Sequence, residues 1–273
     1  MIREVARAKV NLCLHVTGQR DDGLHLLDSL VVFPDVGDML EVRRAQGLSL
    51  DIDGPFAAGL AVEGNLVLEA ARLFPDNGAA MTLHKMLPVA SGIGGGSADA
   101  AATLRAMSEL HGRPLPSSAD QLALGADVPV CVRQEAVRMS GIGEQLSPLP
   151  PLPPFWMVLA NAGEAVPTGA VFANMASRNH APVAPVPRLA DTAALFGYLS
   201  EQRNDMQVSA AGISPVIGAV LEALAGTDGC ALARMSGSGG TCFGLYATEA
   251  EARAAARTVS GVYPDWWVVA APV

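Results

Sequence analysis

Residues 87–110 read LPVASGIGGGSADAAATLRAMSEL and decide the fold of this 273-residue chain. Before the glycines, residues 81–87 (MTLHKML) alternate in polarity as a strand does. After the glycines, apolar residues recur every three positions, as on the buried face of a helix: Ala98, Ala101, Leu104, Met107 and Leu110. Glycines let a ligand approach the backbone, and the first amides of a helix have no partner within it. The order of strand, glycine loop and helix therefore predicts an anion site, and the usual anion is phosphate.

The loop differs from the two commonest phosphate loops. A Walker A loop ends in Gly-Lys-Ser/Thr, and no lysine follows these glycines. A dinucleotide fingerprint has glycine where Ser97 stands, with an acidic residue about 20 residues on. The loop sequence thus argues against a flavin or NAD enzyme. For a run of glycines alone, the alternative is a flexible turn before an ordinary helix.

Composition narrows the class of protein. The net charge is −9 with 18 basic residues and no basic run, which argues against a nucleic-acid groove. The N-terminal residues MIREVARAK lack the apolar core of a signal peptide, and no apolar run of about 18 residues occurs. We therefore expect a cytoplasmic protein with no membrane partner. The four cysteines lie in apolar segments without CxxC spacing and are expected to be buried rather than zinc ligands: Cys13, Cys131, Cys230 and Cys242.

Residues 2–16 predict one or two strands in which four polar or small residues alternate with apolar ones: Lys9, Asn11, Cys13 and His15. The plain interpretation is a polar face turned to solvent. Further along, Asp127 stands two residues before Pro129. Because proline favours an extended residue before it, Asp127 is predicted at a loop-to-strand junction and not inside a helix.

Other elements follow from periodicity and capping. Strands are predicted at 30–33, 39–44, 155–161, 242–246 and 266–273, and residues 48–55 are predicted as a strand followed by a turn. Helices are predicted at 64–74, 117–124, 167–175, 189–201, 213–225 and 249–258. The expected caps are Asn65, Ser117 or Ser118, and Ser214, with Pro215 at the first helical position. The proline-rich residues 147–155 (SPLPPLPPF) are interpreted as a stiff connection rather than a ligand for a partner domain. They predict two domains, 1–150 and 151–273.

Three separated blocks resemble one family: AKVNLCLHVTGQRDDGLHLLDSLVVF, LPVASGIGGGSADAAATL and MSGSGGTCFGLY. The segment LGADVPVCV lies between the second block and the third. All of them resemble the GHMP kinases. The first block is the discriminating one and is similar to the branch that phosphorylates 4-diphosphocytidyl-2-C-methyl-D-erythritol. The resemblance implies a two-domain α/β (α+β) fold. Its first domain would be similar to the second domain of ribosomal protein S5 and its second would be ferredoxin-like, with the active site in the cleft between them.

The resemblance implies an enzyme of isoprenoid precursor biosynthesis that transfers the γ-phosphoryl group of ATP to the 2-hydroxyl of that small-molecule substrate. By motif position, Lys9 and Asp127 correspond to the catalytic pair. The positions that correspond to the ATP site are Pro88, Val89, Ala90, Ser91, Gly92, Ile93, Gly94, Gly95, Gly96, Ser97, Ala98, Asn65 and Lys85. Those that correspond to substrate contacts are Asn11, Leu24, His25, Thr168 and Gly239, with His25 on the cytosine. Mg²⁺ is expected with ATP, held by phosphates and water without a named protein ligand, and the protein is expected to be a monomer or weak homodimer.

The chemistry agrees with these positions. A carboxylate beside an acceptor hydroxyl can take its proton, and a lysine beside it can neutralise charge that builds on the phosphoryl oxygens. Several residues also have plain structural interpretations. Asp127 could be a turn aspartate, Lys85 an exposed strand lysine, Asn65 and Thr168 helix caps, and residues 237–240 a tight strand entry.

One departure concerns substrate affinity. The family usually has tyrosine where this chain has Leu24, and leucine offers no ring face for base stacking, which is worth about 1–3 kcal/mol. We therefore expect weaker cytidine binding with near-normal turnover. Two alternatives stay open at this point: a GHMP kinase for another small alcohol, such as a homoserine or mevalonate type, and a non-catalytic ATP-binding regulator of the same fold.

Overall fold

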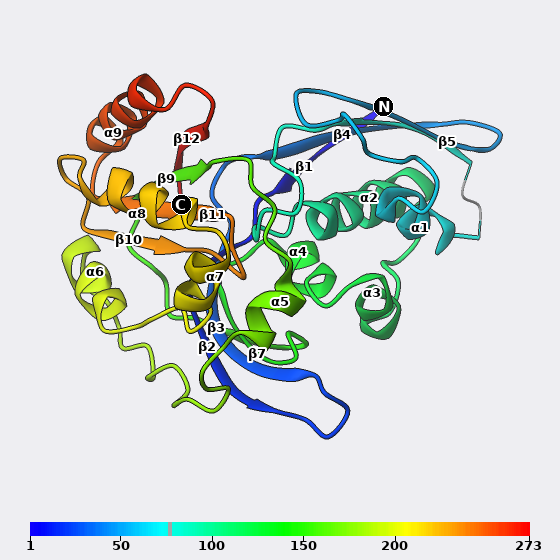
Figure 1. Ribbon diagram of the computed structural model, residues 1–273. Coiled ribbons are helices and arrows are strands. Elements are labelled where there is room, and N and C mark those ends of the chain that lie inside the picture. Colours follow the sequence, from blue (N-terminus) through cyan, green and yellow to red (C-terminus); the bar gives the residue numbers. More distant parts are fainter. Residues whose placement is uncertain (76–77) are drawn as a thin grey trace. The chain divides into compact units, whose positions relative to one another are not determined.

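The computed structural model describes residues 1–75 and 78–273, and Figure 1 shows its ribbon. The chain forms two compact units and passes more than once into each. The first unit comprises Met1–Lys9, Val36–Val89 and Gly94–Glu135, and the second comprises Val10–Asp35, Ala90–Ile93 and Ala136–Val273. The predicted division of the chain into consecutive domains at residue 150 stays a prediction.

The first unit is a four-stranded sheet with helices packed on it. Its strand order is β1-β4-β6-β5, with β5 parallel to β6 and the other pairs antiparallel. The strands are β1 (Ile2–Arg7), β4 (Gly37–Arg44), β5 (Leu48–Asp53) and β6 (Ala79–His84). The helices are α1 (Leu66–Arg72), α2 (Gly95–His111), α3 (Ser118–Leu124) and α4 (Val128–Arg133). Helix α2 packs against β1, β4, α1 and α4, so it is the central element of this unit.

Helix α2 confirms the order predicted from the glycine stretch. The residues predicted at three-residue spacing are fully buried up to Met107, and Leu110 is partly buried. The helix begins at Gly95, directly after Gly94, and ends at the left-handed residue Gly112. Small residues dominate its buried face, which allows the helix to lie close to the sheet.

The second unit holds two antiparallel sheets. One has the order β2-β3-β7-β8, formed by β2 (Val10–Gln19), β3 (His25–Val32), β7 (Val137–Gly141) and β8 (Gln145–Pro148). The other has the order β10-β11-β9-β12, formed by β9 (Trp156–Asn161), β10 (Leu232–Met235), β11 (Thr241–Tyr246) and β12 (Trp267–Pro272). The remaining helices are α5 (Thr168–Ala173), α6 (Thr192–Ser200), α7 (Gln207–Ile213), α8 (Val216–Ala225) and α9 (Glu249–Val262).

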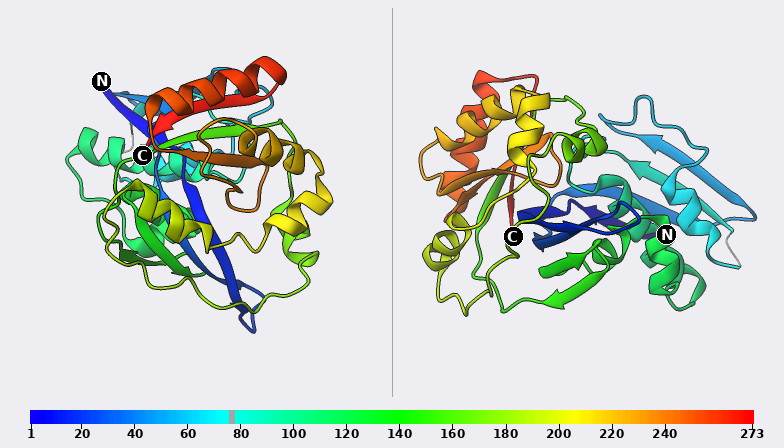
Figure 2. Two further views of the ribbon diagram at one scale, coloured as in Figure 1. Left: turned by 90° about the vertical axis from the view of Figure 1, so that its left-hand side faces the viewer. Right: turned by 60° about the horizontal axis from the view of Figure 1, so that its bottom comes forward.

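Helices α8 and α9 lie on one face of the sheet β10-β11-β9-β12 (Figures 1 and 2). The chain order there is β9-α8-β10-β11-α9-β12, a β-α-β-β-α-β motif. The expected ferredoxin-like arrangement is therefore confirmed. The core between the sheet and these helices is apolar and includes Val158, Ile217, Val220, Ala252 and Val259.

One expectation about residues 2–16 is wrong. The side of residues 2–16 that was expected to face solvent is buried, because each of its polar side chains finds a partner inside the protein: Lys9, Asn11 and His15, with Cys13 between them. The strand itself divides into β1 and β2, and a register shift between Asn11 and Cys13 breaks the simple alternation.

Residues 128–132 form helix α4 instead of the predicted strand. Pro129 lies in the first turn of the helix. A backbone N–H there has no partner within the helix, so proline, which lacks this N–H, is tolerated. Asp127 is the residue before the helix, so it lies at a loop-to-helix junction. Ser214 is not a cap, because its hydroxyl donates to Glu164 and Pro215 occupies the position before α8. Helix α7 was not predicted.

Several local predictions are confirmed. Asn65 caps α1, and Ser117 caps α3 in a reciprocal pair with Asp120. All four cysteines are free thiols, three of them fully buried. Within residues 1–75 and 78–273, no helix is both long enough and apolar enough to span a bilayer.

Candidate active site

The Lys9 ammonium lies 2.9 Å from a carboxylate oxygen of Asp127. The lysine side chain is buried, whereas that of Asp127 is 31% exposed. Asp127 stands at the N-cap position of α4, yet its side chain accepts no hydrogen bond from the helix. An aspartate at this position ordinarily caps the helix. The carboxylate of Asp127 does not, and it is left for Lys9 and for solvent.

Helix α4 is held in place by Arg105 of α2. The Arg105 guanidinium pairs with Glu4 at 2.8 Å and also donates to the backbone carbonyl oxygens of Cys131 and Val5. This one side chain ties α2 to both β1 and α4. The junction that carries Asp127 is thus anchored to the helix that follows the glycine loop.

The glycine loop reaches the Lys9–Asp127 pair at Gly94. Gly94 has φ +65°, and a Cβ atom there would lie 3.2 Å from Lys9 Cβ and 3.9 Å from Asp127 Oδ2. A Cβ atom on Gly125 would lie 3.6 Å from the Ser97 hydroxyl. The structure therefore brings together Lys9, Asp127 and the start of α2, whose first amides are available to an anion.

The two glycine clusters pack backbone against backbone. A Cβ atom on Gly92 would lie 2.5 Å from the Gly239 carbonyl oxygen, and one on Gly237 would lie 2.5 Å from the Gly92 carbonyl oxygen. Ser236 adds a hydrogen bond from its hydroxyl to the Gly92 carbonyl oxygen at 3.1 Å. This close approach requires glycine at Gly92 and Gly237, which explains the second cluster better than a tight strand entry alone.

Lys85 is not the exposed lysine of the plain interpretation. Its side chain is buried, and its ammonium lies between the carboxylates of Asp38 and Asp99. Burial lowers the pKa of Lys85, but the two carboxylates, Asp99 first, outweigh it and the net shift is upward. Two of the three ammonium donors of Lys85 are used within the protein.

The side-chain amide of Asn11 is only partly satisfied among the described residues, because its nitrogen has a hydrogen-bond partner and its oxygen has none. Its Nδ2 donates to the Ser29 hydroxyl at 2.7 Å, and Ser29 in turn donates to the Cys13 carbonyl oxygen at 2.6 Å. The Asn11 backbone N–H donates to the Ser236 hydroxyl. Within the described part of the chain, Asn11 Oδ1 is buried and accepts no hydrogen bond. Buried acceptors are rarely left without a hydrogen bond, so this oxygen is a candidate to accept one from a ligand.

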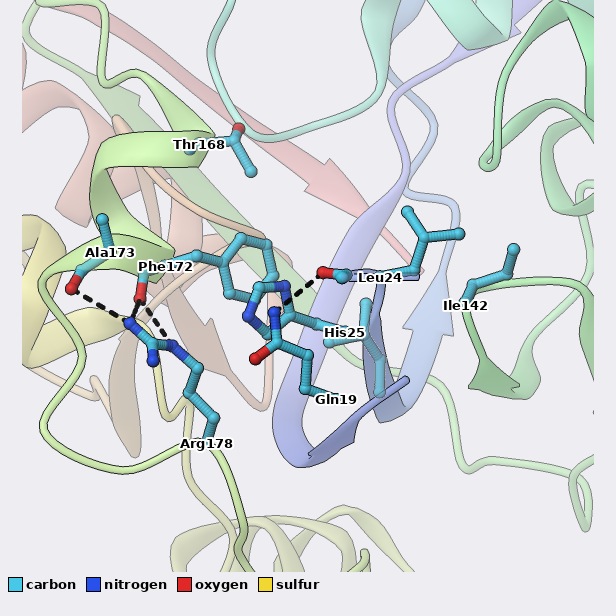
Figure 3. A pocket seen from close by; sticks show the side chains of 11 residues that line it. Gln19, Leu24, His25, Ile142, Thr168, Phe172, Ala173 and Arg178 are labelled. Atoms are coloured by element: carbon cyan, nitrogen blue, oxygen red, sulfur yellow. Dashed lines mark hydrogen bonds between the residues drawn. The ribbon is translucent and has the colours of Figure 1, made fainter. Parts of the chain in front are cut away.

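A pocket of about 570 Å³ lies in the second unit. Figure 3 shows its walls, which come from the turn between β2 and β3 with the adjoining strand ends, from the turn after β7, from α5 and from the segment after α5. Three of the predicted substrate residues line it, Leu24, His25 and Thr168. Asn11 and Gly239 do not line this pocket, and both are instead bonded to Ser236.

Two rings are stacked in the pocket. The His25 and Phe172 rings lie 3.9 Å apart, nearly parallel at 8° (Figure 3). Arg178 donates to the Phe172 and Ala173 carbonyl oxygens at the end of α5. Burial, and then the Arg178 charge, lower the pKa of His25, so its ring is neutral at neutral pH. A neutral imidazole offers one donor and one acceptor to a ligand.

The other ATP-site positions are distributed around the loop. Asn65 uses its side chain to cap α1, accepting from the Val67 N–H and donating to Ala61. Val89 is about half exposed, Ser91 is buried, and Ala90 has a left-handed backbone. Contacts of these residues with a nucleotide stay predictions.

Comparison with known protein families decides the class. The GHMP kinases N terminal domain matches residues 65–135, and the GHMP kinases C terminal domain matches residues 188–265. Together these matches cover more than half of the chain.

The chain belongs to the GHMP kinase family.

This GHMP kinase has close relatives over nearly its whole length. It is 55% identical over 271 residues to a 4-diphosphocytidyl-2-C-methyl-D-erythritol kinase of Cereibacter sphaeroides, with 98% of each chain covered. It is 54% identical to the enzyme of that name from Ruegeria pomeroyi, with 97% of each chain covered. A solved structure of 4-(cytidine 5'-diphospho)-2C-methyl-D-erythritol kinase matches with TM-score 0.79 and 31% identity over 98% of each chain. A homoserine kinase from Cytophaga hutchinsonii shares the fold at 16% identity and TM-score 0.69.

The structure adds residues that sequence reasoning on this GHMP kinase missed. They are Asp38 and Asp99 beside Lys85, Ser29 and Ser236 beside Asn11, and Phe172 and Arg178 in the pocket. Asp99 lies within the glycine motif, two residues after Ser97, so its position alone was a signal. Ser29 and Ser236 lie within the first and third family blocks, and the remaining three carry no local pattern.

Proposed function

We propose that this enzyme transfers the γ-phosphoryl group of ATP to the 2-hydroxyl of 4-diphosphocytidyl-2-C-methyl-D-erythritol. The observation that carries the proposal is the Lys9–Asp127 ion pair beside Gly94. The near full-length relatives of that name support the choice of acceptor.

In this proposal, Asp127 accepts the proton of the acceptor hydroxyl as the hydroxyl oxygen attacks phosphorus. The partly exposed carboxylate of Asp127 leaves room for the incoming hydroxyl, and the side chain of its partner Lys9 is buried. Lys9 stabilises the negative charge that develops on the phosphoryl oxygens. A positioned base of this kind contributes about 10²–10⁴ in rate.

The first turn of α2 and the loop before it bind the nucleotide phosphates. Helix α2 starts without a side-chain cap, and the Ala98 N–H donates to the Gly94 carbonyl oxygen. The amides of the first turn, before Ala98, can therefore donate to phosphate oxygens. Mg²⁺ would neutralise phosphate charge, and we propose that phosphates and water hold most of its coordination sphere. Within residues 1–75 and 78–273, no cluster of three His, Cys, Asp or Glu side chains is arranged to hold a metal by itself.

The pocket beside His25 accommodates the cytidine end of the acceptor. Phe172 stacks on His25 and lines the pocket with it, and the neutral His25 ring has one donor and one acceptor nitrogen for a pyrimidine edge. Leu24 lines the same pocket and offers only apolar contact. This arrangement supports recognition of a nucleoside rather than of a small alcohol alone.

A panel of acceptors tests the proposal. The purified enzyme would be incubated with Mg²⁺·ATP and, in turn, 4-diphosphocytidyl-2-C-methyl-D-erythritol, homoserine or mevalonate, and ADP release would be measured. We expect turnover with the first acceptor, and ³¹P NMR should place the new phosphate on its 2-hydroxyl. Turnover only with another alcohol would overturn the choice of acceptor, and ATP binding without turnover on any acceptor would indicate a non-catalytic binder.

A further inference from the structure

Three buried charges meet beside the phosphate loop, and we call Asp38, Lys85 and Asp99 the Lys85 cluster. The Lys85 ammonium is 2.7 Å from Asp99 Oδ2 and forms a second short contact with Asp38 Oδ2. All three side chains are at most 5% exposed. With one cation and two carboxylates, the fully ionised cluster carries a net charge of −1 in a buried position.

The cluster joins three elements at the loop. Asp38 lies in β4, Lys85 follows β6, and Asp99 lies in the second turn of α2. A Cβ atom on Gly95, the first residue of α2, would lie 3.3 Å from the Lys85 ammonium. The cluster therefore sets where the first turn of α2 lies on the sheet.

The two carboxylates differ in their hydrogen bonds. Asp38 Oδ1 accepts from the backbone N–H groups of Met86 and Leu87, at 2.6 and 2.8 Å. With Lys85 on its other oxygen, the charged form of Asp38 is well satisfied. Asp99 Oδ2 accepts from Lys85, but its Oδ1 is buried and has no hydrogen-bond partner among residues 1–75 and 78–273. The charged form of Asp99 is thus the poorly supported one, so a proton added to the cluster goes to Asp99.

We propose that the Lys85 cluster takes up a proton when nucleotide phosphate binds at the first turn of α2, with Asp99 as the group that carries it. The inference rests on the proposed use of ATP. A phosphate anion next to Gly95 adds negative charge beside a cluster that is already net negative, and a proton on Asp99 removes that repulsion. By linkage, the protonated enzyme binds the nucleotide more tightly, and affinity falls as the pH rises through neutrality.

The pKa of Asp99 in the free protein agrees with Asp99 as the group that takes up the proton. Burial is the main cause that raises the pKa of Asp99, to about 7; Lys85 opposes the shift, and Asp38 adds to it. Asp99 of the free protein is therefore partly protonated at neutral pH, so it can take up only a fraction of a proton there.

The elements that pack against α2 carry these other charged or titratable groups: Arg3, Glu4 and Arg7 on β1, Glu41, Arg43 and Arg44 on β4, Glu69 and Arg72 on α1, and Asp127, Cys131 and Arg133 at α4. An arginine side chain is always protonated and cannot take up a further proton. Glu41 pairs with Arg3. Glu4 pairs with Arg105, Arg72 pairs with Glu69, and Asp127 pairs with Lys9. Burial first, then Asp127 and Asp99, raise the pKa of the Cys131 thiol, so it stays protonated at neutral pH.

Calorimetric titration with Mg²⁺·ADP at pH 7, in two buffers of different ionisation enthalpy, measures the proton uptake directly. We expect the wild type to take up a measurable fraction of a proton per ADP and Asp99→Asn to take up close to none. The asparagine keeps an oxygen acceptor for Lys85. Glu109→Gln, which removes an exposed carboxylate near the other end of α2, should behave as the wild type.

Equal proton uptake in the wild type and Asp99→Asn would overturn the proposal while leaving nucleotide use intact, whereas no binding of ADP by the wild type would overturn both.

A second measurement, the pH dependence of stability, needs no nucleotide. A raised pKa of Asp99 in the folded state makes the wild type lose stability as the pH rises from about 4 to about 7. Asp99→Asn should lose less over that range, and an identical loss would also overturn the proposal.

Discussion

Gly94 and Lys9 are in such close contact that a single methyl group on Gly94 would lie 3.2 Å from Lys9 Cβ. Contacts of 3.2 Å are shorter than ordinary carbon–carbon packing at about 3.5–4.0 Å, so an alanine at Gly94 must displace Lys9 or the loop. The position of the glycine loop and that of the ion pair are therefore one structural constraint.

Gly94→Ala should lower kcat and also destabilise the protein. The left-handed backbone at φ +65° costs a non-glycine residue about 1–2 kcal/mol, and the new methyl group displaces Lys9 from Asp127. Gly112→Ala is the matched control, because Gly112 has φ +61° at the other end of α2 with nothing within 4 Å of an added Cβ. Chemical denaturation should give similar losses of stability, whereas steady-state kinetics should show loss of kcat only for Gly94→Ala. Equal kcat values in the two variants would contradict the constraint.

Ser29→Ala should raise the acceptor KM with little change in the ATP KM. Ser29 donates to Cys13 and accepts from Asn11 Nδ2, so it fixes which amide atom of Asn11 is left for a ligand. Loss of this orientation costs about 1 kcal/mol or more, hence about fivefold or more in acceptor KM. Thr227→Val, which removes a buried hydroxyl bonded to Leu224 and Tyr246, is the control and should leave both KM values unchanged. The same rise in KM for both variants would assign Ser29 a purely structural role.

Leu24→Tyr should lower the acceptor KM. Leu24 is 47% exposed at the pocket that contains the His25–Phe172 stack, and a tyrosine there would add a ring face for the pyrimidine. Base–aromatic stacking of about 1–3 kcal/mol corresponds to about 5- to 150-fold in affinity. The ATP KM and kcat should change little and serve as internal controls. An unchanged or higher acceptor KM would refute the stacking argument.

His15 should make stability depend on pH below about 6.5. Its Nδ1 bonds the Ala181 carbonyl oxygen at 3.1 Å, and its Nε2 accepts from the Arg203 N–H at 3.4 Å, so the pair of bonds requires the neutral ring. Burial, and then Arg203, lower the pKa of His15. A lowered pKa in the folded state means that the His15 contribution is complete above the unfolded pKa of about 6.5 and is lost as the pH falls below it. Urea denaturation at pH 7.5, 6.5 and 5.5 should show a smaller loss for His15→Gln than for the wild type. Parallel losses in the two proteins would show that His15 does not contribute.

Local patterns in the sequence predicted the elements that depend on neighbours in the chain. The glycine stretch predicted α2 correctly, because a helix face with three-residue spacing and a left-handed start at Gly94 are both local features. The caps at Asn65 and Ser117 were predictable for the same reason. Asp127 was predicted at a junction, but proline rules favoured a strand after it, and contacts with α2 and α3 instead stabilise a short helix.

The charged and polar contacts between distant segments could not be predicted. The resemblance placed Lys85 at the ATP site, whereas the local pattern alone made it an exposed strand lysine. The local pattern is wrong because the two partners of Lys85 are 47 and 14 residues away and only the fold brings them together. Asn11 and His15 looked solvent-facing for the same reason, since their partners come from residues 29, 181 and 203. Alternation identifies the two sides of a strand, but it does not indicate whether a polar side meets water or other parts of the chain.

The most direct test of the central claim is the turnover of Asp127→Asn. Acceptor-dependent ADP release from ATP and 4-diphosphocytidyl-2-C-methyl-D-erythritol would be compared with the wild type, with the product checked by ³¹P NMR and ADP affinity measured in parallel. We expect a loss of about 10²-fold or more in kcat with nucleotide affinity nearly unchanged, because the asparagine keeps the contact with Lys9 and loses only the base. A variant that retains kcat within a few-fold of the wild type would contradict the role of the Lys9–Asp127 pair.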